Sequence, residues 1–194
     1  MKTVDMLGQP CPIPVINAKK ALREAKVGDV VAVLVDNDIA RQNLEKMAAG
    51  LGHQAASTKT DKGHFQVTIT LGEGKPRTAE APGGLVVAVG SEKMGRGRDD
   101  SLALTLMKAF VHSLTELDTP PEYLLFYNGG AFLTTEGSAC LPDLEAVSAR
   151  GTVISTCGAC LDFYGLTEKL KVGAVTNMYA IASTMAQAAR LINV

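Results

Sequence analysis

The sequence predicts an α/β protein built from two small domains. Apolar residues make up 46% of its 194 residues and charged residues 20%, so the chain can bury a core and lacks the polar bias of disordered proteins. Aromatic residues account for only 5%, and the aliphatic remainder suits buried parallel strands beneath helices. Segments with strand periodicity alternate with segments of helical periodicity, which is the pattern of an α/β fold.

The first 72 residues predict a two-layer α/β sandwich with the element order βαβαββ. The segment at 30–35 reads Val-Val-Ala-Val-Leu-Val without a polar interruption, which indicates a buried strand. Asp38 is the expected N-cap of the second helix. In chain order, the elements that the pattern places are a strand at 3–7, a helix at 12–25, a strand at 30–35, a helix at 39–51 and a strand at 65–71.

Residues 85–194 predict an open, mainly parallel sheet with flanking helices. Strands are expected at 85–89, 123–127, 152–155 and 174–176, and a short helix at 142–149. A long helix before Pro120-Pro121 should bury the face formed by Leu102, Leu106, Phe110, Leu114 and Leu117. A final helix should bury the face formed by Met178, Ile181, Met185, Ala188 and Ile192. Sites in such sheets lie at the carboxyl ends of the strands.

A Gly- and Pro-rich segment at 73–84 predicts a linker between domains at 1–72 and 85–194. Residues 1–78 carry eleven basic and eight acidic side chains, whereas 79–194 carry eight and twelve, although chance alone also produces such differences. The net charge of −1 argues against a general nucleic-acid binder. Without a signal peptide or a long apolar run, a cytoplasmic protein without a membrane span is expected.

Cys11 stands immediately before the expected first helix. The dipole and the open N–H groups of a helix start favour the thiolate, which is the nucleophilic form. Pro12 and Pro14 carry no N–H, so Ile13 and Val15 are the expected donors. A buried structural cysteine is the alternative, but the polar, Pro-rich neighbours favour a functional one.

The segment from Asp5 to Leu22, with Cys-Pro-Ile-Pro at 11–14 and Ala-Lys-Lys-Ala-Leu at 18–22, resembles the TusA/SirA-like family of sulfur carriers. The resemblance covers about residues 1–72 and implies the sandwich fold described above. It also implies that Cys11 carries sulfur as a persulfide.

Cys157 and Cys160 form a Cys-x-x-Cys motif directly after an expected strand. Such a pair can close a disulfide, and its first thiol usually has the lower pKa. A zinc site would need two further ligands, and the three histidines are scattered, so zinc and a plain core pair remain as alternatives. The histidines are His53, His64 and His112.

Cys157 followed by Gly165-Leu166 resembles the DsrE/DsrF-like proteins, which handle sulfur through a cysteine after a central strand. That resemblance implies that Cys157 is the active position and that Cys160 is an addition. The joined architecture, with Gly129-Gly130-Ala131-Phe132-Leu133-Thr134 and Thr176-Asn177-Met178-Tyr179, resembles the YedF-like proteins linked to selenium metabolism.

Two further features, Cys140 and the loop at 90–98, carry a less specific functional pattern. Cys140 precedes the helix at 142–149 and is expected to be a half-buried, helix-flanking residue, although it could resolve a mixed disulfide. The Gly-rich loop at 90–98 lacks the ending of a P-loop and is expected to be a solvated rim of the cysteine site. Its cations, which could attract an anionic persulfide, selenide or acidic partner, are Lys93, Arg96 and Arg98.

These features predict a sulfur or selenium carrier that needs no cofactor or resident metal. Cys11 would take sulfur from a cysteine desulfurase or another donor, Cys157 would be the second carrier, and Cys160 would resolve it before an acceptor protein receives the cargo. Self-association through the second domain is a further expectation. The alternative is a non-catalytic redox sensor that docks RNA or an acidic partner through Lys19, Lys20, Arg23 and Lys26.

Overall fold

The protein is described by a computed structural model at residues 1–60, 62–72, 83–95 and 97–194. The chain divides into two compact units, Met1–Glu80 and Ala81–Val194. Apart from Gly83 and Gly84, the linker expected at 73–84 lies outside the described residues, so the domain boundaries stay a prediction. Arg96 also lies outside the described residues. In the part of the chain that is described, no helix combines the length and the apolar content needed to cross a membrane.

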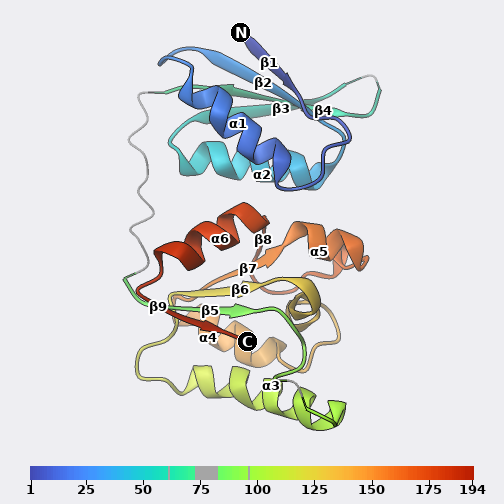
Figure 1. The fold of residues 1–194 in the computed structure, drawn as a ribbon, viewed down its shortest axis with the longest axis vertical. Helices are drawn as coiled ribbons and strands as arrows, with labels where there is room; N and C mark the ends of the chain where they lie inside the picture. Colours follow the sequence, from blue (N-terminus) through green and yellow to red (C-terminus); the bar gives the residue numbers. More distant parts are fainter. Residues whose placement is uncertain (61, 73–82, 96) are drawn as a thin grey trace. The chain divides into compact units, whose positions relative to one another are not determined.

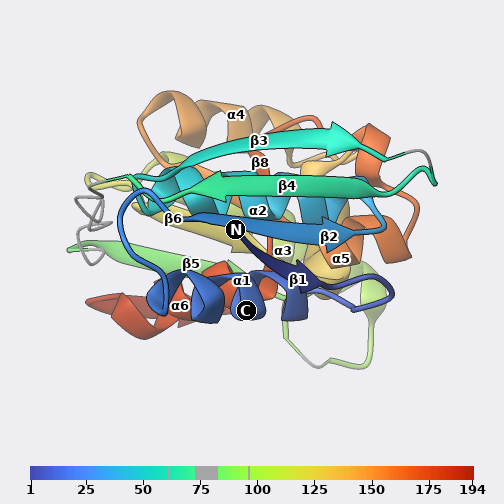
Figure 2. The same ribbon diagram turned by 90° about the horizontal axis from the view of Figure 1, so that it is seen from above.

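The N-terminal unit is a two-layer sandwich of a four-stranded sheet and two helices. The strand order is β1-β2-β4-β3, with β1 parallel to β2 and the other pairs antiparallel. Figure 2 shows the four strands side by side, and α1 and α2 lie together on one face of the sheet. The elements are β1 (Lys2–Asp5), α1 (Ile13–Arg23), β2 (Val30–Val35), α2 (Asp38–Gly50), β3 (Gln54–Lys59) and β4 (Phe65–Thr70).

The core of this unit forms where β2 meets the helices. Val31, Val33 and Val35 are fully buried and share a cluster with Ala18 of α1 and Leu44 of α2. Alternate residues of a strand point to one face, which is why every second residue of this run, at positions 31, 33 and 35, enters the same core. The predicted sandwich is therefore confirmed.

Two local expectations need correction. Asn37, not Asp38, is the N-cap of α2, because the Asn37 side chain accepts a hydrogen bond from the Ala40 N–H at 2.8 Å. Strand β3 was not placed by the sequence pattern, since Gln-Ala-Ala-Ser-Thr-Lys has no apolar alternation. It is an edge strand with mostly exposed residues, held by its backbone pairing to β4.

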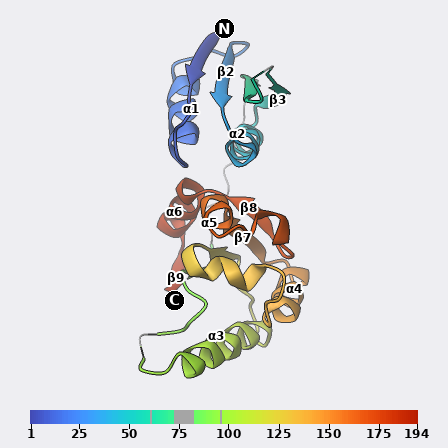
Figure 3. The ribbon, with the colours of Figure 1, turned by 90° about the vertical axis from the view of Figure 1, so that its right-hand side faces the viewer.

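The C-terminal unit has a five-stranded sheet, all parallel, in the order β8-β7-β6-β5-β9. Figures 1 and 3 show α3 and α4 on one face and α5 and α6 on the other. The strands are β5 (Leu85–Val89), β6 (Tyr123–Phe126), β7 (Val153–Cys157), β8 (Ala174–Thr176) and β9 (Arg190–Asn193). The helices are α3 (Asp100–Thr115), η1 (Asn128–Thr134), α4 (Leu141–Ala149), α5 (Gly158–Phe163), η2 (Thr167–Lys169) and α6 (Met178–Gln187).

The buried face of α3 agrees with the expected one at Leu114, which is buried, and at Phe110, which packs against the core, but it differs at the start of the helix. Ala103, Met107 and Val111 are buried, whereas Leu102 is 57% exposed and Leu106 is 44% exposed. Both faces of this helix carry apolar residues, so periodicity alone could not choose between them. Packing against α4 and the sheet buries the face that carries Ala103, Met107 and Val111.

The end of the chain also differs from expectation. Helix α6 ends at Gln187, and residues 190–193 form β9, which pairs in parallel with β5. Ile192, expected in the core of a helix, therefore lies in an edge strand and is 38% exposed. The apolar Leu191-Ile192 pair is too short for periodicity to separate a strand from a helix end.

Candidate functional site

Cys11 lies half-buried in the loop between β1 and α1, directly before Pro12, the N-cap of α1. The side chains of two acids hold this loop at its start. The Leu7 N–H donates to Asp5 Oδ1 at 3.1 Å, and the Gly8 N–H donates to Asp36 Oδ2 at 2.7 Å. The Cys11 thiol is therefore carried on a fixed backbone at the carboxyl ends of β1 and β2.

One of the two donors expected near Cys11 is already engaged. The Ile13 N–H donates to the Pro10 carbonyl at 3.0 Å, inside the same loop. Of the two amides named from the sequence, this leaves Val15, because Pro12 and Pro14 have no N–H. The Ile13 amide therefore serves the turn, and support of a Cys11 thiolate by these amides stays a prediction.

Asp36 links the Cys11 loop to the start of α2. Its Oδ1 accepts from Asn37 Nδ2 at 2.9 Å, and Asn37 in turn caps α2. The hydrogen bond from the Gly8 amide is the main reason why the pKa of Asp36 lies below its ordinary value. The charged carboxylate is thus the form that holds the loop.

Replacing Asp36 with Ala should lower the free energy of unfolding by about 1 kcal/mol at pH 7, because a hydrogen bond to a charged group is lost. The folded-state pKa lies below the ordinary 3.8, so the difference from wild type should be complete above that pH and fade as the pH falls through the folded value. Urea unfolding from pH 7 to pH 3 measures it. Asp36→Asn keeps an acceptor and should retain most of the stability, and an equal loss in both variants would contradict the Gly8 contact.

Cys157 is the last residue of β7 and the N-cap of α5. It is 1% exposed and packs with Val86, Leu125 and Ile181 on the face covered by α6. Burial raises the pKa of its thiol to about 11, although the N–H groups of Cys160 and Ala159 favour the thiolate. At pH 7 roughly one molecule in ten thousand would carry this thiolate. The pKa of this first thiol is thus raised rather than lowered, because desolvation exceeds the effect of the amides.

Cys160 lies one turn further on in α5 and is half-buried. Its side chain interacts with that of Cys157 and contributes to the raised pKa of the Cys157 thiol. The backbone N–H of Asn128 donates to Cys160 Sγ at 3.0 Å, and Asn128 Oδ1 accepts from the Tyr164 hydroxyl at 3.0 Å. Asn128 and Tyr164 carry no motif that the sequence pattern singles out, although Asn before Gly-Gly at a strand end is a signal for unusual backbone.

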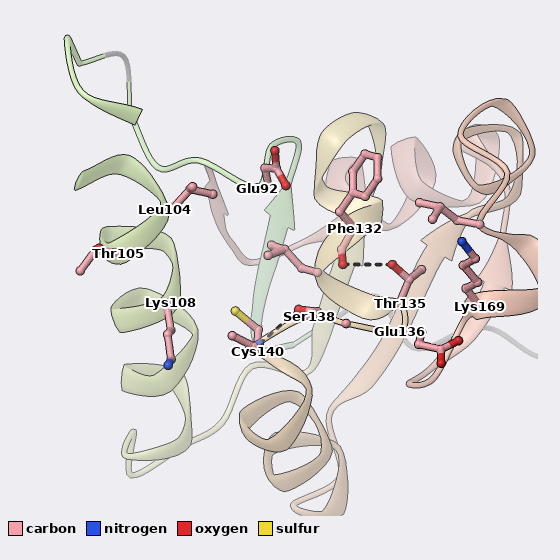
Figure 4. Close-up of a pocket in the computed structure, with 14 residues that line it drawn as sticks. Glu92, Leu104, Thr105, Lys108, Phe132, Thr135, Glu136, Ser138, Cys140 and Lys169 are labelled. Carbon is pink, nitrogen blue, oxygen red and sulfur yellow. Dashed lines mark hydrogen bonds between the residues drawn. The ribbon is translucent and has the colours of Figure 1, made fainter. Parts of the chain in front are cut away.

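Cys140 is separate from this pair. It precedes α4 as expected, but it is 3% exposed rather than half-buried, and burial raises the pKa of its thiol. Figure 4 shows it beside a pocket of about 600 Å³ between α3 and η1. The charged side chains that line the pocket are Glu92, Lys108, Glu136 and Lys169.

The sequence left open a disulfide, a metal site and a role for the loop at 90–98. All four cysteines are reduced thiols without a disulfide. Across the described residues there is no group of three His, Cys, Asp or Glu side chains that could hold a metal. Lys93 pairs with Asp100 at 2.7 Å, so its charge is partly compensated. The start of the loop lies beside η1, where a Cβ on Gly129 would be 3.6 Å from Ser91 Cα.

Known proteins match the N-terminal part of the chain. The family described as "Sulfurtransferase TusA" matches residues 2–71. A "Putative sulfur carrier protein" of Methanocaldococcus jannaschii is 32% identical over 69 residues, which are 36% of this chain and 92% of that protein. A "SirA-like protein" of Desulfitobacterium hafniense is 60% identical, with 37% of this chain and 99% of that one covered and a TM-score of 0.36.

A solved structure with a wider match is the "ychN protein" of Escherichia coli. It is 17% identical and covers 57% of this chain and 99% of its own, with a TM-score of 0.45. The Methanocaldococcus jannaschii relative is matched over nearly its full length, and Cys11 lies within the segment that matches the family. Through residues 2–71, the chain belongs to the TusA family.

Proposed function

We propose that this protein is a sulfur carrier that holds sulfur as a persulfide on Cys11. The observation that carries the proposal is the position of Cys11 immediately before the N-cap of α1, within a segment that matches the TusA family. Relatives named as sulfur carriers support the same role. The exposed loop position leaves the thiol within reach of a partner, whereas a core cysteine would not be.

The loading step needs no net oxidation. The Cys11 thiolate attacks the outer sulfur of a donor persulfide, the bond between that sulfur and the donor thiol breaks, and the donor leaves as a thiolate. The product is a persulfide on Cys11. A cysteine desulfurase is the proposed donor, because such an enzyme presents sulfur in this form, and a downstream protein thiol is the proposed acceptor.

The second proposed site is the thiol pair Cys157 and Cys160 in a DsrE-like unit. The two side chains interact across one turn of α5, so a persulfide on one thiol can be attacked by the other. Selenium in place of the transferred sulfur follows the same chemistry and is proposed as an alternative cargo. Self-association of the C-terminal unit also stays a proposal, and the exposed Leu102 and Leu106 are the surface that would serve it.

The test is to incubate the full chain with a cysteine desulfurase and cysteine, then to locate the added sulfur by peptide mass spectrometry. We expect a gain of one sulfur atom on the peptide that contains Cys11, because its thiol meets the donor persulfide directly. A parallel reaction with the desulfurase and selenocysteine, in which the donor enzyme presents selenium as a bound perselenide, tests the cargo because the Cys11 thiolate can attack the outer selenium and release the donor thiolate. Cys140 is the internal control, since a buried thiol with a raised pKa should stay unmodified.

Absence of any gain on Cys11, Cys157 and Cys160 would overturn the carrier proposal. A redox sensor would instead show a Cys157–Cys160 disulfide after mild oxidation and no transferred sulfur. The two functions are therefore separated by the same peptide map, because a disulfide removes two hydrogens whereas a persulfide adds a sulfur.

A further inference from the structure

The two thiols of the C-terminal unit differ in what surrounds them. Cys157 is 1% exposed among apolar side chains, whereas Cys160 is half-buried and packs at the border of two apolar clusters. A donor persulfide must approach the attacking sulfur in line with the bond that breaks. Solvent access therefore favours Cys160 for the first contact with a donor.

A fixed donor also points at Cys160. The Asn128 N–H lies 3.0 Å from Cys160 Sγ, within the range of a hydrogen bond to sulfur. Asn128 has a φ of 47°, in the left-handed region that few residues other than glycine adopt. This backbone conformation turns its amide toward the sulfur, and amide donors stabilise a thiolate.

Tyr164 holds Asn128 in place from the other side. Its hydroxyl donates to Asn128 Oδ1 at 3.0 Å, and its ring contacts Phe132 with centroids 4.9 Å apart. Gly130 allows η1 to approach the end of β5, because a Cβ there would lie 2.2 Å from the Val89 carbonyl oxygen. The amide that meets Cys160 is thus held by contacts on both sides of Asn128.

We propose that Cys160 is the thiol that receives sulfur in the C-terminal unit, that Asn128 positions it, and that Cys157 is the resolving thiol. This assignment rests on the proposed carrier function and reverses the order expected from the sequence. The high pKa of Cys157 suits the later role, because a protonated, buried thiol does not compete for the incoming sulfur.

The chemistry balances in two steps. The Cys160 thiolate attacks the outer sulfur of a donor persulfide, and the donor thiolate leaves. Cys157 then loses its proton to water and attacks Cys160 Sγ, which forms the Cys157–Cys160 disulfide and releases hydrosulfide. The transferred sulfur gains two electrons from the two thiols, and a thiol reductant restores the pair.

The decisive comparison is Cys157→Ser against Cys160→Ser in the full chain, with inorganic polysulfide as one donor and a cysteine desulfurase with cysteine as the other. Cys157→Ser should accumulate a persulfide on Cys160, because no resolving thiol remains. Cys160→Ser should show at least about tenfold less persulfide on Cys157, because that thiol is buried and protonated. Persulfide trapped on Cys157 in Cys160→Ser, or equal trapping in both variants, would overturn the assignment.

Alkylation by iodoacetamide keeps the assignment testable without any sulfur transfer. Cys160 in Cys157→Ser should react at least about tenfold faster than Cys157 in Cys160→Ser, and the reverse order would refute the proposal. If Cys11 takes up sulfur and neither thiol of the pair does, the assignment fails while the carrier function stands. If Cys11 also takes up none, the carrier function fails and the alkylation rates alone decide on Cys160.

The role of Asn128 has its own matched pair of variants in the Cys157→Ser background. Asn128→Gly keeps the N–H and adopts a positive φ readily, whereas the β-branched side chain of Asn128→Val disfavours it. The alkylation rate of Cys160 should fall about fivefold in the Val variant, and its pH profile should move to higher pH, while the Gly variant stays closer to the parent. Identical pH profiles in both would show that the amide has no influence on the thiol.

Discussion

Replacing Cys11 with Ser is expected to abolish sulfur loading of the N-terminal unit. Cys11 is the one cysteine in residues 1–80 of the sequence, so no neighbouring thiol can substitute for it. A serine hydroxyl stays protonated at neutral pH and forms no persulfide. With inorganic polysulfide or a cysteine desulfurase as donor, peptide mass spectrometry should find no added sulfur on the peptide containing residue 11, while the wild type gains one atom.

A charge-reversal variant separates chemistry from docking. Lys20 and Arg23 are exposed in the second half of α1, so Lys20→Glu with Arg23→Glu changes the surface charge and leaves the thiol intact. This variant should accept sulfur from inorganic polysulfide like the wild type. Two outcomes would contradict the role given to Cys11. One is sulfur found on residues 1–80 of Cys11→Ser, and the other is failure of polysulfide loading in the charge-reversal variant.

Replacing Gly130 with Ala is expected to destabilise the C-terminal unit by about 1–3 kcal/mol, the range for overpacking. The added Cβ would lie 2.2 Å from the Val89 carbonyl oxygen and 2.9 Å from its carbon. These are backbone atoms of a central strand, so η1 must move instead. That movement would displace the Asn128 amide from Cys160, so slower alkylation of Cys160 should accompany the lower denaturant midpoint.

The neighbouring glycine provides the control. A Cβ on Gly129 would lie 3.6 Å from Ser91 Cα, which is an ordinary contact. Gly129→Ala should therefore unfold at nearly the wild-type denaturant concentration and keep the reactivity of Cys160. Equal midpoints for Gly129→Ala and Gly130→Ala would show that the close approach of η1 to β5 does not matter for stability.

Local patterns were sufficient to predict the elements with strong signals. The uninterrupted apolar run of β2 and the proline pair around Cys11 placed a buried strand and a helix start without tertiary information. The alternation of strands and helices predicted the parallel sheet of the C-terminal unit. These signals are local because each depends on residues within a few positions of one another.

The sequence pattern did not give the positions of elements that are stabilised by distant partners. Strand β3 has no apolar pattern and exists because its backbone pairs with β4. Strand β9 looked like the end of a helix and is held by β5, about a hundred residues earlier in the chain. For α3, two apolar faces compete in the sequence, and only packing shows that Met107 and Val111 are the buried ones.

The sequence by itself determined which cysteines lie in Cys-Pro-x-Pro and Cys-x-x-Cys patterns, because both are patterns of nearby residues. Only the tertiary structure distinguished the thiols of the second motif. Burial by Val86, Leu125 and Ile181 comes from three separate elements, and the amide that meets Cys160 comes from Asn128, 32 positions away. The pKa of a thiol depends on its solvation and on nearby donors, and both are set by residues that meet only in the folded chain.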